Sequence, residues 1–167
     1  MAINSINNSV SLNTYEPITL ADFEALDSTS ISQLSVSTIS TIEADQLSKI
    51  PADAFMGLSA TQLAALPNQL VSTLSLEQLA ALSSKQLAGL SSGSSGQIRQ
   101  LTSDQIQALS ADQISGLSAN QVSSMQNDQI AAFTSNQIPS LGIPAIQALG
   151  TSQLEAMTAD QLQALTT

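Results

Sequence analysis

Residues 102–133 read TSDQIQAL-SADQISGL-SANQVSSM-QNDQIAAF, which is one eight-residue motif written four times. In each copy two apolar residues stand three positions apart, as Ile106 and Leu109 do. The same spacing extends in both directions, from Phe23 to Leu165, with nine octads before a three-residue insertion and nine after it. A fixed period of this kind indicates a repeat architecture.

The spacing of the apolar residues predicts one short helix in every octad. A strand requires strict alternation, which is absent, and in one long helix the apolar stripe would turn by about 80° per octad. Ser or Thr often follows the second apolar residue, with Gln three positions later, which is the pattern of an N-terminal capping box. The predicted pairs are Ser59–Gln62, Ser83–Gln86, Thr102–Gln105, Ser110–Gln113, Ser118–Gln121, Thr134–Gln137 and Thr158–Gln161. Pro51 and Pro67 hold the cap position in two other octads, where no helix can run through.

Helices this short are unstable alone in water, so they must be held by packing on neighbours. The predicted fold class is therefore an all-α solenoid of very short helices, one per eight-residue repeat. We expect two repeats per coil, with three as the alternative. Small residues before the second apolar position, such as Ala108 and Gly116, should let adjacent helices approach closely. The expected core is Phe23, Phe55, Leu63, Leu79, Leu87, Ile106, Leu109, Ile114, Leu117, Ile130, Phe133, Leu162 and Leu165.

Interruptions of the period suggest how the chain is organised. Residues 1–20 do not repeat and are expected to form an N-terminal cap or an extended segment. Residues 21–91 form the first half of the solenoid and residues 97–167 the second. Between them, residues 92–96 belong to a Ser/Gly-rich insertion, expected to be a bulge or a hinge. Pro139 falls inside an expected helix and should distort its octad.

Charge and hydropathy exclude several classes of partner. The chain carries 13 acidic and 3 basic residues, for a formal charge of −10. Lys49, Lys85 and Arg99 are scattered singly, so no basic footprint for nucleic acid or an anionic membrane surface exists. No apolar run reaches the length of a membrane span, and the first residues do not resemble a Sec signal peptide. We expect an extracellular or cell-surface location reached by a non-Sec route, with a cytoplasmic location as the alternative.

The residue types argue against catalysis. The chain has no His and no Cys, so the usual general base, the thiolate nucleophile and the commonest metal ligands are missing. We expect no enzyme activity and no cofactor. Most acids lie near expected helix N-termini, where a carboxylate favours the helix dipole. Asp112, Asp128 and Asp160 differ by multiples of sixteen residues, so with two octads per coil they would share a ridge and weakly bind Ca²⁺.

The octad Ser/Thr-x-x-Gln-Ile/Leu-x-Ala-Leu resembles repeat tracts of very large bacterial secreted or surface proteins, adhesin-like or described in terms of heme utilisation. The resemblance covers roughly residues 22–166 and implies an extended extracellular spacer or adhesive array. It carries over no heme ligand, because the chain lacks His and Cys. The expected function is a rod-like structural module. The alternatives are a filament subunit that stacks as a homo-oligomer through the solenoid ends, and a solenoid that binds an unidentified protein.

Overall fold

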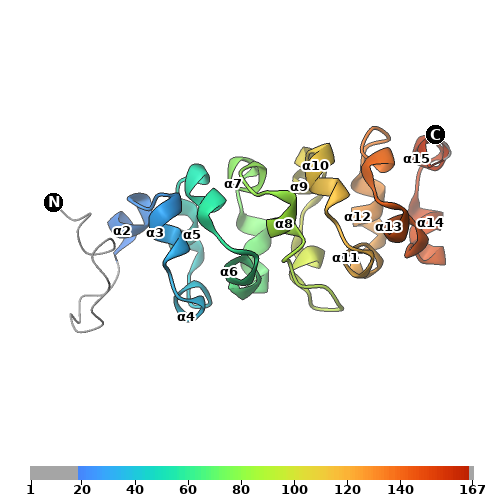
Figure 1. The fold of residues 1–167 in the computed structure, drawn as a ribbon. Helices are drawn as coiled ribbons and strands as arrows, with labels where there is room; N and C mark the ends of the chain where they lie inside the picture. Colours follow the sequence, from blue (N-terminus) through green and yellow to red (C-terminus); the bar gives the residue numbers. More distant parts are fainter. Residues whose placement is uncertain (1–18, 166–167) are drawn as a thin grey trace.

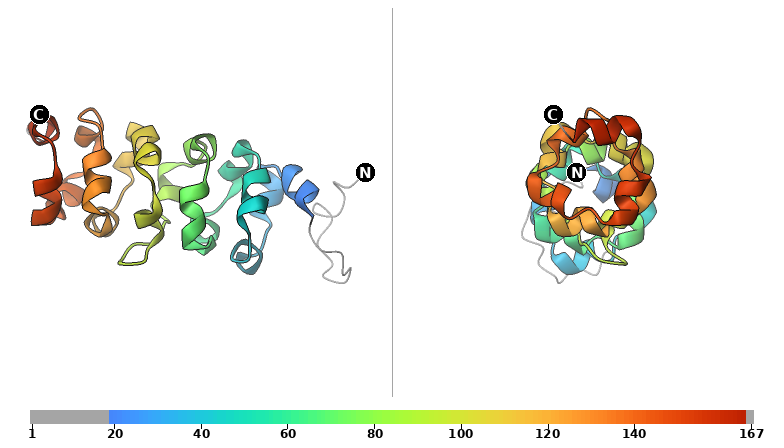
Figure 2. Two further views of the ribbon diagram at one scale, coloured as in Figure 1. Left: turned by 180° about the vertical axis from the view of Figure 1, so that it is seen from behind. Right: turned by 90° about the vertical axis from the view of Figure 1, so that its right-hand side faces the viewer.

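The protein forms a rod of short helices wound as a coil, with the first described helix at one end of the rod and the last at the other (Figure 1). The computed structural model describes residues 19–165. Within these residues all regular structure is helical, in segments of three to six residues. Each octad contributes one helix, as the sequence predicts, and the view along the rod shows the helices arranged around a closed ring (Figure 2).

The helices follow one another with short corners between them. The first half contains α2 (Leu20–Glu24), α3 (Ser28–Ser32), α4 (Val36–Ile39), α5 (Ala44–Lys49), η1 (Ala52–Gly57), α6 (Ala60–Ala65), η2 (Asn68–Thr73), α7 (Leu76–Ala80) and α8 (Ser84–Leu87). The second half contains η3 (Gln97–Gln100), α9 (Ser103–Ala108), α10 (Ala111–Ser115), α11 (Ala119–Ser124), α12 (Asn127–Ala132), η4 (Ile138–Ser140), α13 (Ile143–Gln147), α14 (Thr151–Ala156) and α15 (Ala159–Ala164). Here η denotes a 3₁₀ helix.

Proline determines where most of the 3₁₀ helices occur. Pro51 and Pro67 are the N-cap residues of η1 and η2, and Pro139 lies inside η4. The remaining 3₁₀ helix, η3, follows the Ser/Gly insertion. The expected distortion at Pro139 is therefore confirmed, since its octad forms only the three-residue helix η4.

At corners such as the one between α9 and α10, two consecutive residues are extended, the second apolar residue of one octad and the cap residue of the next. At Leu109 the backbone has φ −63° and ψ 133°, and at Ser110 it has φ −71° and ψ 161°. The second apolar side chain still points inward, because Leu109 is buried. The chain therefore changes direction without taking its apolar side chains out of the core.

The expectation of two octads per coil is wrong. Helices pack against helices three octads away, as α9 does on α12 and α11 on α13. Glutamine side chains bond to carbonyls four octads earlier, as Gln113 does to Leu79. Each octad therefore contacts both the third and the fourth octads before it in the chain. One turn of the solenoid consequently contains more than three octads and fewer than four. The corner angle fixes this number, and the apolar pattern is the same for any number of octads per turn.

A single apolar core runs along the axis of the rod. The predicted residues Phe23, Phe55, Leu63, Leu79, Leu87, Ile106, Leu109, Ile114, Leu117, Ile130 and Phe133 are all buried in it. Leu162 and Leu165 are exceptions, because Leu162 is 42% exposed and Leu165 is half-buried. Both belong to the last described coil, on which no further coil packs among the described residues.

The insertion is a bulge on one corner, and the core continues past it. Gly93 at its tip has φ +100°, a left-handed conformation that favours glycine. The Gly93 N–H donates to Ser124 Oγ at 2.9 Å, which fastens the bulge to the next coil. On either side of the insertion, η2 packs on η3 and α7 packs on α9. The predicted segment 1–20 lies almost entirely outside the described residues.

Candidate functional site

A column of buried glutamines joins successive coils and is the most distinctive chemical feature of the molecule. Gln113, 4% exposed, shows its geometry. Its Oε1 accepts from the Ser110 N–H at 2.9 Å, while Ser110 Oγ accepts from the Gln113 N–H at 3.2 Å. Its Nε2 donates to the carbonyl oxygens of Leu79 at 2.8 Å and Leu82 at 2.7 Å, one coil earlier. One amide therefore caps its own helix and bonds to the coil below.

The same arrangement recurs along the rod. The predicted reciprocal caps are present at Ser59–Gln62, Ser83–Gln86, Thr102–Gln105, Ser110–Gln113, Ser118–Gln121 and Thr158–Gln161. At Thr134 only half of the pair forms: the Thr134 N–H donates to Gln137 Oε1 at 2.8 Å, and η4 begins at Ile138. The glutamines that also bond to carbonyls of the preceding coil are Gln62, Gln78, Gln86, Gln97, Gln105, Gln113, Gln121, Gln129, Gln137, Gln153 and Gln161.

Besides capping, the sequence suggests ladders of glutamine amides between repeats, and the structure shows that these amides bond to backbone carbonyls of the preceding coil. The sequence contains a further signal for these bonds. Gln153 follows Gly150, which has no side chain with which to cap, and yet Gln is kept. In the structure Gln153 Oε1 accepts from the Gly150 N–H, and its Nε2 donates to the carbonyls of Val122 and Met125. Where the cap residue is Pro51 or Pro67, with no N–H, the Gln position holds Ala54 or Leu70. Gln is therefore absent at both positions where the cap residue has no N–H to donate to it.

The insertion preserves the column. Ser91 and Gln97 are six residues apart instead of three, but the Ser91 N–H still donates to Gln97 Oε1 at 3.0 Å and Ser91 Oγ accepts from the Gln97 N–H at 2.9 Å. Gln97 Nε2 reaches the carbonyls of Leu63 and Leu66 at 2.9 and 2.8 Å. The capping pair therefore spans the bulge, and the polar contacts between coils are continuous across it.

We expect Ser110→Ala to lower the free energy of unfolding by about 1 kcal/mol, because the Gln113 N–H loses its side-chain acceptor. Urea unfolding followed by circular dichroism measures the change. Ser115→Ala is a matched control, since the exposed Ser115 hydroxyl donates only to the Asp112 carbonyl of its own helix. Equal stabilities of the two variants would contradict a capping role for Ser110.

Close backbone contacts between coils explain the small residues that precede the second apolar position. A Cβ built on Gly57 would overlap the Ser28 carbonyl oxygen, and one on Gly89 would lie 2.7 Å from Ala60 Cβ. Both partners are 29 positions earlier in the chain. The prediction that small side chains permit close approach of the helices is confirmed at these sites.

Gly57→Ala is expected to destabilise the protein by about 1–3 kcal/mol, because η1 must move away from α3 to admit the new methyl group. Thermal unfolding of the variant measures this cost. Gly142→Ala provides the comparison: its Cβ would meet only Pro144 Cδ at 3.7 Å, and its φ of −64° suits any residue. A melting temperature for Gly57→Ala as high as that of Gly142→Ala would show that the contact is looser than described.

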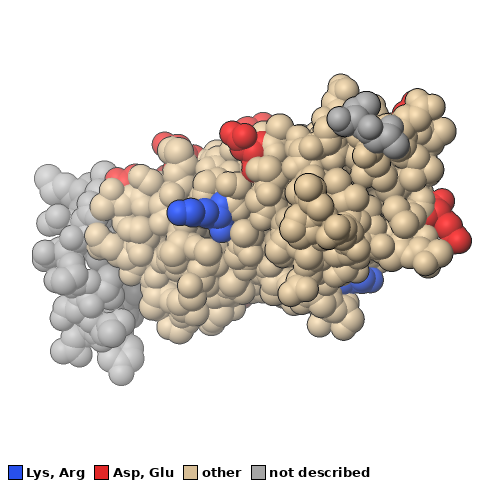
Figure 3. Space-filling view, turned by 45° about the vertical axis from the view of Figure 1, so that its right-hand side comes forward, with Lys and Arg blue, Asp and Glu red and all other residues tan. Residues whose placement is uncertain are grey.

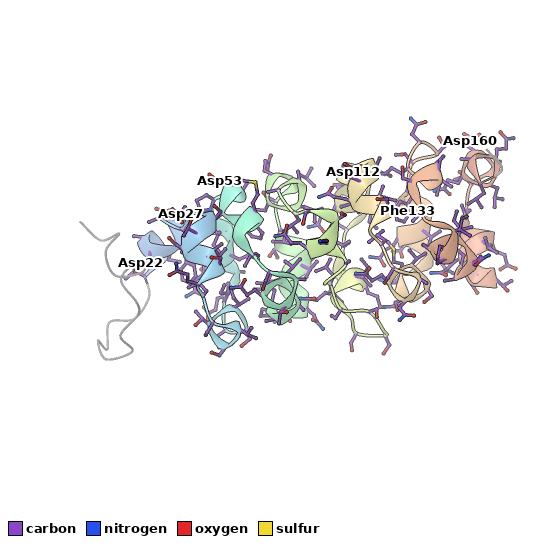
Figure 4. All side chains as sticks on the ribbon, in the orientation of Figure 1. Asp22, Asp27, Asp53, Asp112, Phe133 and Asp160 are labelled. Atoms are coloured by element: carbon purple, nitrogen blue, oxygen red, sulfur yellow. The ribbon has the colours of Figure 1, made fainter. Side chains whose placement is uncertain are left out.

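The carboxylates do not form the predicted ridge. Because adjacent coils bring together octads three apart, residues separated by sixteen positions lie on different sides of the rod. Asp112 and Asp160 stand on separate coils at clearly separated points along it (Figure 4). Within residues 19–165 no group of three or more potential ligands is placed to hold a metal ion. The weak Ca²⁺ candidates Asp112, Asp128 and Asp160 therefore do not form a site, since the spacing argument required two octads per coil.

The few shifted pKa values are explained by local hydrogen bonds. The Ser30 N–H donates to the Asp27 carboxylate at 2.7 Å and holds the pKa of Asp27 below its ordinary value. Glu24 on α2 lies 2.8 Å from Lys49 on α5 and raises the pKa of the lysine. Both partners of this pair are substantially exposed, so it contributes little to stability. Charged side chains are sparse on the face shown in Figure 3, where uncharged residues cover most of the surface.

The structure also bears on membrane association. Among the described residues, no helix combines the length and the apolar character that crossing a bilayer requires.

Comparison with known proteins supports a repeat tract. Residues 94–119, which include the end of the insertion, α9 and α10, match the family model of the ALTTAQ repeat. No curated protein and no solved structure matches the chain. The match and the regular stacking of octads agree that this chain is a helical repeat module.

Proposed function

We propose that this chain is a structural rod that holds apart whatever lies at its two ends. The observation that carries the proposal is the glutamine column, in which each amide bonds to its own cap and to the coil before it, as Gln105 does to Thr102, Val71 and Leu74. Together with the unbroken apolar core, these bonds resist bending and sliding between coils. A stiff rod whose length is set by the number of octads suits a spacer or scaffold.

A bacterial surface or secreted protein is the setting we propose for this rod. The octad resembles repeat tracts of that kind, and the ALTTAQ repeat match supports the repeat character itself. We propose export by a non-Sec route, and a cytoplasmic scaffold is the alternative location. We propose no catalytic role, because the polar columns of Gln, Ser and Thr are engaged in structural hydrogen bonds.

The spacer function predicts that length follows octad number. Ala44 and Ala159 are exposed, and the chain has no cysteine, so Ala44→Cys with Ala159→Cys gives a specific pair of dye sites. Single-molecule energy transfer should give one narrow distance. Deleting residues 102–133 removes four octads and leaves the register of the glutamines intact, so the distance should shorten by roughly 10 Å, about one coil.

Measurements on the same labelled protein can also contradict the spacer function. A broad distance distribution in the full chain would mean that the rod bends freely, and no shortening on deletion would mean that the coils rearrange. Either result would remove the spacer function. As a control, the exposed substitution Ile143→Asp should leave both distances unchanged.

A further inference from the structure

The C-terminal end of the described rod exposes side chains that are core residues elsewhere. Leu154 is 39% exposed and Leu162 is 42% exposed, whereas Val122 and Ile130, their counterparts four octads earlier, are 0% and 1% exposed. The last helices, α14 and α15, form this end in Figure 1 and face the viewer in the right-hand view of Figure 2. The end face therefore continues the surface on which every inner coil receives the next one.

The backbone of this end also carries the acceptors that the glutamine column uses. Inside the rod, the carbonyls of Leu109 and Met125 accept from Gln137 Nε2 and Gln153 Nε2. Their counterparts in the last coil are the carbonyls of Leu141 and Met157, and no described residue donates to either. The end of the rod thus presents exposed apolar side chains together with pairs of carbonyl acceptors. Their spacing matches the one that a Gln-containing octad uses inside the rod.

The first coil does not carry the matching donors. At the position that holds glutamine in most later octads, the first three octads have Asp22, Ser30 and Thr38. Only the fourth has a glutamine, Gln46. The Asp22 carboxylate accepts from the Thr19 N–H and Oγ1, both at 2.8 Å, so it closes its own cap. An ionised carboxylate cannot donate to a carbonyl oxygen, and its charge would oppose the carbonyl dipoles.

We propose that the C-terminal coil is a template for further octads carrying the Ser/Thr-x-x-Gln motif, and that the N-terminal coil of a second copy does not fit it. The chemistry of the occupant is defined by its parts. It brings an apolar pair three residues apart to cover Leu154 and Leu162, and a Gln amide to donate to each carbonyl pair. The rod is directional, because its amides point from each coil toward the preceding one. The inference rests on coil packing and is independent of the rod's role as a spacer.

A chain extended by one known block tests the template. Joining residues 102–133 directly after Leu165 would place the added Gln105, Gln113 and Gln121 at the carbonyl pairs of residues 138 and 141, 146 and 149, and 154 and 157. We expect the added block to fold as helix and to raise the hydrogen-exchange protection of α14 amides at least about tenfold. A matched block with those three glutamines changed to Glu has nearly the same shape but a carboxylate in place of each donor amide.

Three results would overturn the proposal. The proposal fails if the added block stays without helix, if the Glu block protects α14 as well as the Gln block does, or if the unextended chain self-associates through this face. The last is checked by the mass of the unextended protein over a range of concentrations, where we expect a constant monomer mass. A mass that grows with concentration in the parent, but not in Leu162→Glu, would identify a second copy as the occupant. Val36→Glu, at an exposed site near the other end, controls for added charge.

Discussion

Replacing Ile114 with aspartate is expected to unfold the middle of the rod. Ile114 is 0% exposed and lies on α10, which packs on α8 in one direction and on η4 in the other. A carboxylate in that position would lose its hydration and meet no cation, so we expect a loss of about 4 kcal/mol or more in the free energy of unfolding. Circular dichroism at 222 nm during urea titration measures it.

The effect of Ile114→Asp should also spread in a particular way. Each coil contacts only its neighbours, so the coils next to α10 should lose hydrogen-exchange protection before the ends do. Ile143→Asp serves as the control, because Ile143 is 72% exposed at the first turn of α13 and should tolerate the charge within about 0.5 kcal/mol. If both variants unfolded at the same urea concentration, the assignment of inward and outward positions would be incorrect.

Gln113→Leu is expected to destabilise the protein by about 3–5 kcal/mol, although leucine is apolar and similar in size. The change removes the acceptor of the Ser110 N–H and the donor to the buried Leu82 carbonyl, whereas the Leu79 carbonyl still accepts from the Leu82 N–H at 3.2 Å. Each such buried group left without a partner costs about 1–3 kcal/mol. Denaturant unfolding gives the total. If glutamine acted only as a local cap, the loss would be near 1 kcal/mol, as for Ser110→Ala.

A double-mutant cycle separates the two parts of the glutamine's role. Two octads of this chain already combine a proline at the cap position with an apolar residue at the glutamine position, Pro51 with Ala54 and Pro67 with Leu70. The φ of −71° at Ser110 and the extended Leu109 before it suit proline at position 110. Ser110→Pro removes the N–H that Gln113 accepts, so combining it with Gln113→Leu should cost about 1 kcal/mol less than the two single changes added together. Additive costs would mean that cap and amide act independently.

Local structure could be predicted because its determinants lie within a few residues of one another. The capping bond from the Gln113 N–H to Ser110 Oγ joins positions three apart, and the apolar pair Ile114 and Leu117 has the same spacing. Both are visible in one octad. The buried columns from Phe23 to Phe133 follow from this local pattern, because each short helix has only one apolar side to bury.

Predictions that depended on the relation between coils were less successful. The number of octads per turn was wrong, and the ridge of Asp112, Asp128 and Asp160 depended on that number. The burial of Leu162 was also wrong, since burial at an end depends on which coil lies beyond it. The glutamines do bond between repeats, but their Nε2 groups donate to backbone carbonyls 28–34 residues earlier and do not form the suggested ladders of amides.

The spacing of residues along the chain was enough to predict an all-helical repeat, one helix in each octad, capping boxes such as Ser110–Gln113 and most of the core. These features follow from spacings of three and eight residues along the chain, which do not depend on how the coils pack. Only the tertiary structure decided how many octads complete a turn, where the carboxylates stand and what the glutamine Nε2 groups bind. The physical reason is that the backbone changes direction at each corner, as at Leu109 and Ser110, and the sum of these turns determines which distant octads come together.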